Sequence, residues 1–154
     1  SRVLDAGCGP GRVGSQLAAA GHDVVGVDID PVLISAAEHD HRGPTWLVAD
    51  LAELDLPAAG IVEGFDIIMC AGNVMTFLDP ATRKPVLDRL ARHLRSGGRI
   101  VTGFGSGRDY SFDEFFVDVE QVGLTPELLL STWDLRPFTR DADFLVAVLS
   151  PTRA

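Results

Sequence analysis

The stretch from Val3 to Gly14, which reads VLDAGCGPGRVG, constrains the fold of this chain more than any other. A short apolar run ends in Asp5, and glycine then occupies every second position from 7 to 11. Apolar residues at helical spacing follow, including Val13 and Leu17. This order predicts a strand, a tight glycine-rich turn and the start of a helix. Glycine suits such a turn because it accepts positive φ and leaves room for a ligand beside the backbone.

The rest of the 154-residue chain continues this alternation of strand and helix signals. Strands are predicted at 2–6, 23–28, 45–49, 65–71 and 99–104, and helices at 11–20, at 31–41, from about 79–85 to the glycines at 97–98, and at about 111–123. Two β-rich runs at 127–136 and 143–149 predict a C-terminal hairpin. The pattern predicts an α/β fold in one domain, residues 1–154: a three-layer, doubly wound, mostly parallel sheet with an antiparallel C-terminal hairpin strand.

Polar residues follow the predicted strands at the edge where ligands bind in open α/β sheets. Asp5, Asp28 and Asp50 end the first three strands, and Gly72-Asn73 follows the fourth. Two of these aspartates have a structural explanation when taken alone, since Asp28 precedes a helix cap and Asp50 can cap a turn. Their joint occurrence beside the glycine turn favours a ligand site.

Composition narrows the class of ligand. The formal charge of −9 disfavours nucleic acid as a partner. No apolar stretch is long enough for a transmembrane helix, so no membrane association is expected. Cys8 and Cys70 form no CxxC pair and the four histidines are scattered, so no metal site is expected. Two thiols at predicted strand ends or turns of a buried sheet suit a reducing cytoplasm.

Residues 3–14 resemble the first motif of the class I S-adenosylmethionine-dependent methyltransferases, Asp/Glu-x-Gly-x-Gly-x-Gly, which stands here as DAGCGPG at 5–11. The resemblance extends to Asp28, to Asp50, to FDII at 65–68 and to LRSGGR at 94–99. It implies a Rossmann-like domain that uses S-adenosylmethionine and releases S-adenosylhomocysteine. Members of this family usually carry one or two helices before the first strand. The chain opens two residues before that strand, so these lid helices are expected to be missing.

The resemblance also implies roles for individual residues. Asp28 would accept hydrogen bonds from the ribose hydroxyls, Asp50 would accept one from the adenine amine, and the Leu51 N–H would donate to the ring. The glycine turn would approach the methionine portion, and Asp5 would hold the turn or bind the ammonium through water. The full set of predicted cofactor-binding residues is Asp5, Gly7, Cys8, Gly9, Gly11, Arg12, Asp28, Ile29, Asp50, Leu51, Gly72 and Asn73.

Methyl transfer needs alignment of the acceptor more than a fixed set of catalytic groups, and none is evident. Candidate bases are Asn73, Asp109, Tyr110 and Asp113, and an acceptor pocket could be lined by Met75, Phe77 and Phe104, although core packing is the commoner role of such residues. The sequence NVMT at 73–76 differs from the Asn/Asp-Pro-Pro-Tyr of amide-modifying members. A small-molecule acceptor is therefore expected.

Two other functions remain open. Gly9-x-Gly11-x-x-Gly14 with Asp28 has the spacing of a nicotinamide-dependent reductase, but Asp5 and Asp50 would then have no role. No Tyr-x-x-x-Lys set for hydride transfer is present either. A non-catalytic domain of the same fold, which binds the cofactor as a sensor or partner subunit, is the other alternative.

Overall fold

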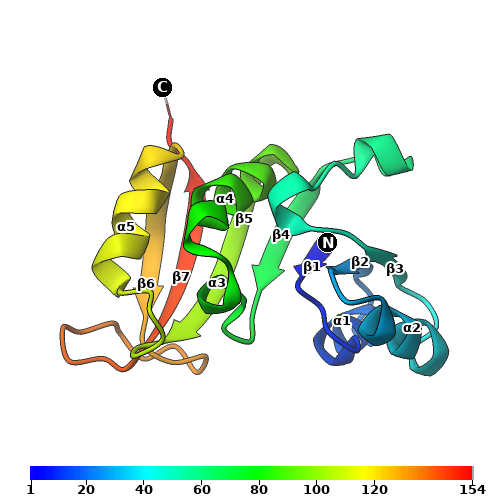
Figure 1. Cartoon of the computed structure of the whole chain (residues 1–154), viewed down its shortest axis with the longest axis horizontal. Helices are drawn as coiled ribbons and strands as arrows, with labels where there is room; N and C mark the ends of the chain where they lie inside the picture. The colour runs from blue at the N-terminus through cyan, green and yellow to red at the C-terminus, as the bar shows by residue number, and fades with distance from the viewer. Residues whose placement is uncertain (154) are drawn as a thin grey trace.

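The computed structural model describes residues 1–153, which form one seven-stranded sheet in the order β3-β2-β1-β4-β5-β7-β6 (Figure 1). The strands are β1 (Arg2–Ala6), β2 (Asp23–Asp28), β3 (Thr45–Val48), β4 (Phe65–Cys70), β5 (Leu94–Gly105), β6 (Leu124–Leu130) and β7 (Phe144–Pro151). The first five are parallel, and β7 lies antiparallel between β5 and β6. The predicted sheet and its antiparallel hairpin strand are confirmed. The order reverses at β1, which pairs with β2 on one side and β4 on the other.

Five α-helices and three short 3₁₀ turns join the strands. They are α1 (Arg12–Ala19), α2 (Pro31–Asp40), α3 (Val74–Phe77), α4 (Arg83–Arg92) and α5 (Phe112–Gln121), with η1 (Leu51–Glu53), η2 (Pro57–Ala59) and η3 (Pro80–Thr82). Local signals explain where the longer helices start. Asp30 caps α2 by accepting from the Val32 N–H at 2.9 Å, and Ser111 caps α5. No helix among residues 1–153 is long and apolar enough to cross a membrane.

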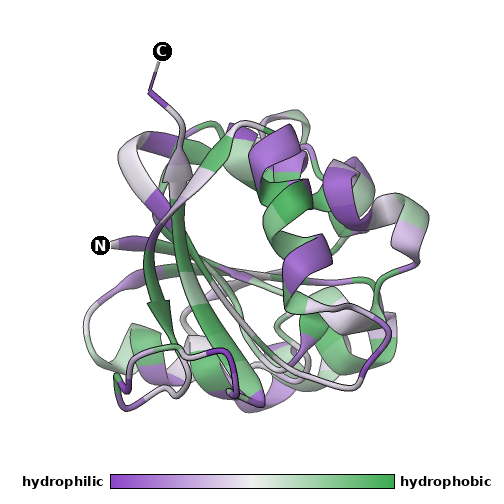
Figure 2. Ribbon diagram, turned by 90° about the vertical axis from the view of Figure 1, so that its left-hand side faces the viewer, coloured by the Kyte–Doolittle hydropathy of each residue, from purple (hydrophilic) through white to green (hydrophobic). Residues whose placement is uncertain are grey.

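The helices are divided between the two faces of the sheet. Figure 2 shows helices beside the sheet with apolar residues turned toward the strands. The larger core joins the central strands to α4 and α5. Within it, Phe104 stacks on Tyr110, and both rings meet Phe115 edge to face, at centroid distances of 5.2 to 5.9 Å. A smaller cluster joins Trp46 of β3 to Ile34 and Ala37 of α2 and to Cys8 of the glycine turn.

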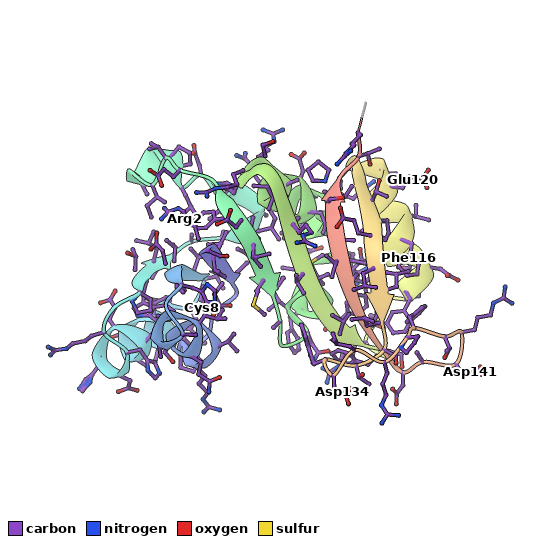
Figure 3. The ribbon with its side chains drawn as sticks, turned by 180° about the vertical axis from the view of Figure 1, so that it is seen from behind. Arg2, Cys8, Phe116, Glu120, Asp134 and Asp141 are labelled. Atoms are coloured by element: carbon purple, nitrogen blue, oxygen red, sulfur yellow. The ribbon has the colours of Figure 1, made fainter. Side chains whose placement is uncertain are left out.

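Part of one face carries no helix. Seen from behind, β4, β5, β7 and β6 lie open to the viewer, whereas α1 and α2 lie to one side of them (Figure 3). Trp133, from the loop after β6, packs against this face beside Gly103, where a Cβ would lie 2.6 Å from the indole. Within residues 1–153, no helix covers this face of the four strands, whereas α4 and α5 pack against their other face (Figure 3).

Two predicted boundaries are wrong. The fourth helix ends at Arg92, before the glycines at 97–98, and β5 begins at Leu94, because Leu94 pairs with Phe65 and a bulge absorbs the residues before Arg99. The first arm of the hairpin is Leu124–Leu130, and residues 131–143 form its loop. Gly123, at φ +80°, ends α5 and lets the strand begin at once.

Candidate functional site

A cleft of about 340 Å³ lies at the carboxyl edge, where β1, β2, β3 and β4 end. Its lining is Gly7, Asp28, Ile29, Ala49, Asp50, Leu51, Gly72, Val74, Phe77 and Leu78. Its position at the reversal of strand order and its mixture of acids and apolar groups are typical of a cofactor site. Six of the twelve predicted residues therefore meet in one cleft: Gly7, Asp28, Ile29, Asp50, Leu51 and Gly72.

Asp28 joins two loops of this cleft. Its Oδ2 accepts from the Gly9 N–H at 2.9 Å, and its Oδ1 accepts from the Asp30 N–H at 2.9 Å. The Gly7 and Cys8 N–H groups both donate to the Val27 carbonyl at 2.9 Å, so the turn is held against the end of β2. Each carboxylate oxygen of Asp28 can still accept a second hydrogen bond. The side chain is thus held in place with acceptor capacity to spare.

The glycines of the turn serve different purposes. Gly9, at φ +55°, has no atom within 4 Å of the position that a Cβ would take, so its surface is open. A Cβ on Gly7 would lie 2.7 Å from Val74, which crosses the turn from α3. A Cβ on Gly11 would lie 2.8 Å from the indole of Trp46. Gly9 therefore offers backbone to a ligand, whereas packing already explains the glycine at 11.

Trp46 is the residue that sequence reasoning missed beneath the turn. Only 6% of it is exposed, and its indole N–H donates to the His41 carbonyl at 2.9 Å. Cβ atoms on Gly14 and Gly26 would lie 2.9 and 2.3 Å from its ring. The indole therefore fits against Gly11 and Gly14 at the start of α1 and against Gly26 of β2. No local pattern signals such a contact, because it depends on the register of β2 and β3.

Asp5 lies beneath the turn, outside the cleft lining, and is 3% exposed. Burial raises the pKa of its carboxyl to about 6; the Gly14 N–H lowers this pKa by hydrogen bonding, and the charge of Asp28 raises it again. Its Oδ2 has no hydrogen-bond partner. A buried carboxylate with an unpaired oxygen is a cost to the fold, which fits a group kept for binding or for positioning the turn.

Cys8 is a buried thiol that lies between Gly7 and Gly9 of the turn. Burial raises its pKa to about 12, and the charges of Asp5 and Asp28 act in the same direction. Its Sγ contacts the Gly9 carbonyl at 3.5 Å. Arg12, the remaining predicted residue of the turn, begins α1 and is exposed.

Asp50 and Asn73 also have structural roles at the cleft. The Oδ1 of Asp50 caps η1 by accepting from the Ala52 N–H at 2.9 Å, and the side chain stays exposed. Asn73, at φ 61°, accepts from the Gly105 N–H at 2.7 Å and so ties the loop after β4 to the end of β5. The Asn73 side chain is therefore a positioning group for the two loops that border the cleft.

The remaining candidate bases and acceptor-pocket residues divide into residues buried in the core and residues that are exposed. Tyr110 is wrong as a candidate base, because it is 1% exposed, donates to Asp118 at 2.6 Å, and has a pKa that burial raises above its usual range. Met75 and Phe104 are fully buried in the core. Phe77 is 71% exposed and lines the cleft. Asp113 is exposed on α5 and lines a separate hollow.

A family model described as a methyltransferase domain matches residues 3–98, more than half of the chain. The chain belongs to the methyltransferase-domain family. Among curated proteins, this methyltransferase domain is 36% identical over 100 residues to a magnesium-protoporphyrin O-methyltransferase of Rhodobacter capsulatus, a match that spans 62% of this chain and 42% of that protein. It is 30% identical over 123 residues to a ubiquinone biosynthesis O-methyltransferase of Cereibacter sphaeroides, spanning 79% of this chain and 48% of the relative. The chain therefore spans less than half the length of either relative.

Among solved structures, the domain superposes on a TehB-like SAM-dependent methyltransferase from Corynebacterium glutamicum with a TM-score of 0.91 and 44% identity, covering 99% of this chain and 80% of that one. The magnesium protoporphyrin IX methyltransferase of Synechocystis, with bound SAM, shares the fold at a TM-score of 0.73 and 21% identity, covering 97% of this chain and 69% of that one. The seven-stranded sheet thus belongs to a methyltransferase fold.

Proposed function

We propose that this domain binds S-adenosylmethionine in the cleft at the carboxyl edge and transfers its methyl group to a small-molecule acceptor. The observation that carries the proposal is the Asp28 carboxylate, which the turn N–H of Gly9 and the loop N–H of Asp30 hold in place beside open backbone. The similarity to a SAM-dependent methyltransferase over 99% of the chain supports it.

The residues present suit each part of this cofactor. Asp28 would accept from the ribose hydroxyls, the free oxygen of Asp50 would accept from the adenine amine, and the apolar wall at Leu51 and Ile29 would cover the ring. The open backbone at Gly9 leaves room for the methionine portion. When bound, the cofactor supplies a methyl group on a sulfonium, which is already a good leaving group.

The domain's own residues would then align the acceptor and exclude water, which is the main requirement for an in-line displacement. Val74, Phe77 and Leu78 line the cleft on the side of α3 and provide an apolar wall for an acceptor. The charge of −9 disfavours DNA or RNA in this role. Two buried free cysteines support a cytoplasmic setting.

The reductase alternative is weaker than its glycine spacing suggests. Two of the three glycines in Gly9-x-Gly11-x-x-Gly14 lie against Trp46, where a Cβ would come within 2.9 Å of the indole. Packing therefore accounts for that spacing without a dinucleotide.

Calorimetric titration with S-adenosylhomocysteine, with NAD as the control, tests the cofactor. We expect binding of the former alone; binding of NAD, or of neither, would contradict the proposal. Incubation with methyl-labelled S-adenosylmethionine and a protein-free extract of small molecules then tests catalysis. Label should move into the extract, whereas cofactor binding without transfer would favour the non-catalytic alternative.

A further inference from the structure

The guanidinium of Arg108 lies beside the apolar side of the cleft. Arg108, in the loop between β5 and α5, lies with its guanidinium 5.8 Å from the ring centroid of Phe77. Phe77 ends α3 and lines the cleft. A guanidinium over an aromatic face at this distance is attracted by the ring and is held near it. The pair therefore presents a charged hydrogen-bond donor and a flat apolar surface at the opening of the cleft.

The backbone around Arg108 is fixed, although its side chain is exposed. Asp109 is held at φ 58°, and its carbonyl accepts from Arg83 at 2.8 Å. Arg83 is only 6% exposed, and its guanidinium lies 3.9 Å from the ring centroid of Tyr110. Aspartate adopts a positive φ more readily than most residues, so the loop can take this turn at little cost. These anchors place the base of Arg108 accurately while leaving its guanidinium free.

Charge around the cleft makes this guanidinium distinctive. The charged residues that line the cleft are Asp28 and Asp50, both on the side of β2 and β3. Arg108 forms no ion pair within residues 1–153, whereas the buried Arg83 is paired with Glu114. The lining of the cleft is therefore acidic toward the proposed cofactor side, and the guanidinium of Arg108 lies beside the lining at Phe77. Such an arrangement suits two ligands of opposite charge that meet in one cleft.

We infer that the methyl acceptor is a planar apolar molecule that carries a carboxylate, with its ring against Phe77 and its carboxylate on Arg108. This inference rests on the proposed function of the same cleft. Arg108 acts as a specificity residue that offers a planar, two-pronged donor to the carboxylate. Phe77 supplies the surface that selects a flat body over a flexible chain.

Calorimetric titration of the S-adenosylhomocysteine complex with 2-naphthoate and with its neutral counterpart 2-naphthamide tests this. We expect the wild-type complex to prefer the carboxylate by about threefold to tenfold, a preference that shrinks as salt is added. Arg108→Gln should abolish the preference. Arg42→Gln, which removes another exposed and unpaired arginine away from the cleft, should retain it. Phe77→Ala should weaken the binding of both probes.

Equal affinity of the two probes for the wild-type complex, failure of 2-naphthoate to bind, or a preference that survives in Arg108→Gln would overturn the inference. Titration of the same samples with S-adenosylhomocysteine separates this failure from failure of the proposed function. A protein that binds S-adenosylhomocysteine but does not prefer the carboxylate would refute the acceptor class and leave the cofactor intact.

Discussion

Replacing Asp5 with asparagine should stabilise the protein at neutral pH, because this carboxyl is buried with one unpaired oxygen. Its pKa is about 6 in the folded protein against a reference of 3.8. The folded state therefore holds the proton more tightly than the unfolded state. As pH rises from about 4 to 6, the unfolded state loses its proton first, so the free energy of unfolding falls across that window.

The size of this effect follows from the shift in pKa. One pKa unit corresponds to about 1.4 kcal/mol, so ionised Asp5 costs the fold up to about 3 kcal/mol at pH 8 and about half of that at pH 5. Asp5→Asn removes the charge and retains the shape. The gain in the free energy of unfolding of Asp5→Asn over the wild type should therefore be about 1.5 kcal/mol smaller at pH 5 than at pH 8.

Urea unfolding at the two pH values measures this change directly. The amide of the asparagine does not titrate, so its burial costs the same at both pH values, and the difference between them isolates the titration of Asp5. Asp141→Asn, at an exposed loop position, is the matched control and should show no such dependence. An Asp5→Asn protein that is less stable than the wild type at pH 8, with the same deficit at pH 5, would refute the reasoning.

Three further substitutions test the site and its support. Asp28→Asn should lower the affinity for S-adenosylhomocysteine about tenfold to a hundredfold in calorimetry, because the ribose loses its charged acceptor. Asp79→Asn, which alters a helix cap outside the cleft, should leave this affinity unchanged, and equal effects of the two substitutions would contradict the role of Asp28. Gly9→Ala and Gly21→Ala both place a side chain at positive φ in open space, so each should cost about 1 kcal/mol of stability, but only Gly9→Ala should lower cofactor affinity. Trp46→Ala should cost about 3 to 5 kcal/mol in urea unfolding, and a loss below about 1 kcal/mol would show that the indole does not support the turn.

The parallel half of the sheet could be predicted because its signals are local. Val24 to Val27 form a buried run, which is typical of a strand covered on both faces. The Asp30-Pro31 pair marks a helix start, and the structure has it there. Strand ends in turn locate the cleft, because parallel strands deliver their carboxyl ends to one edge.

What sequence could not provide depends on contacts between distant segments. Trp46 looks like an ordinary strand residue until the register places it against the glycine turn. Arg83 looks like an exposed helix residue, yet it is buried beneath Tyr110. The one-turn helix α3 is too short to show a periodic pattern, so Val74 and Leu78 were not predicted at the cleft. The start of β5 depends on a bulge that only pairing with β4 defines.

The most direct test of the account is the location of cofactor binding. Titration of the ¹⁵N-labelled protein with S-adenosylhomocysteine should shift the backbone amide signals of Gly7, Gly9, Leu51 and Gly72 most strongly, because these residues line or border the cleft. Amides around the hollow at 89–95, at the opposite edge, should not move. Shifts centred on 89–95, or no shifts at all, would contradict the central claim that the carboxyl-edge cleft holds the cofactor.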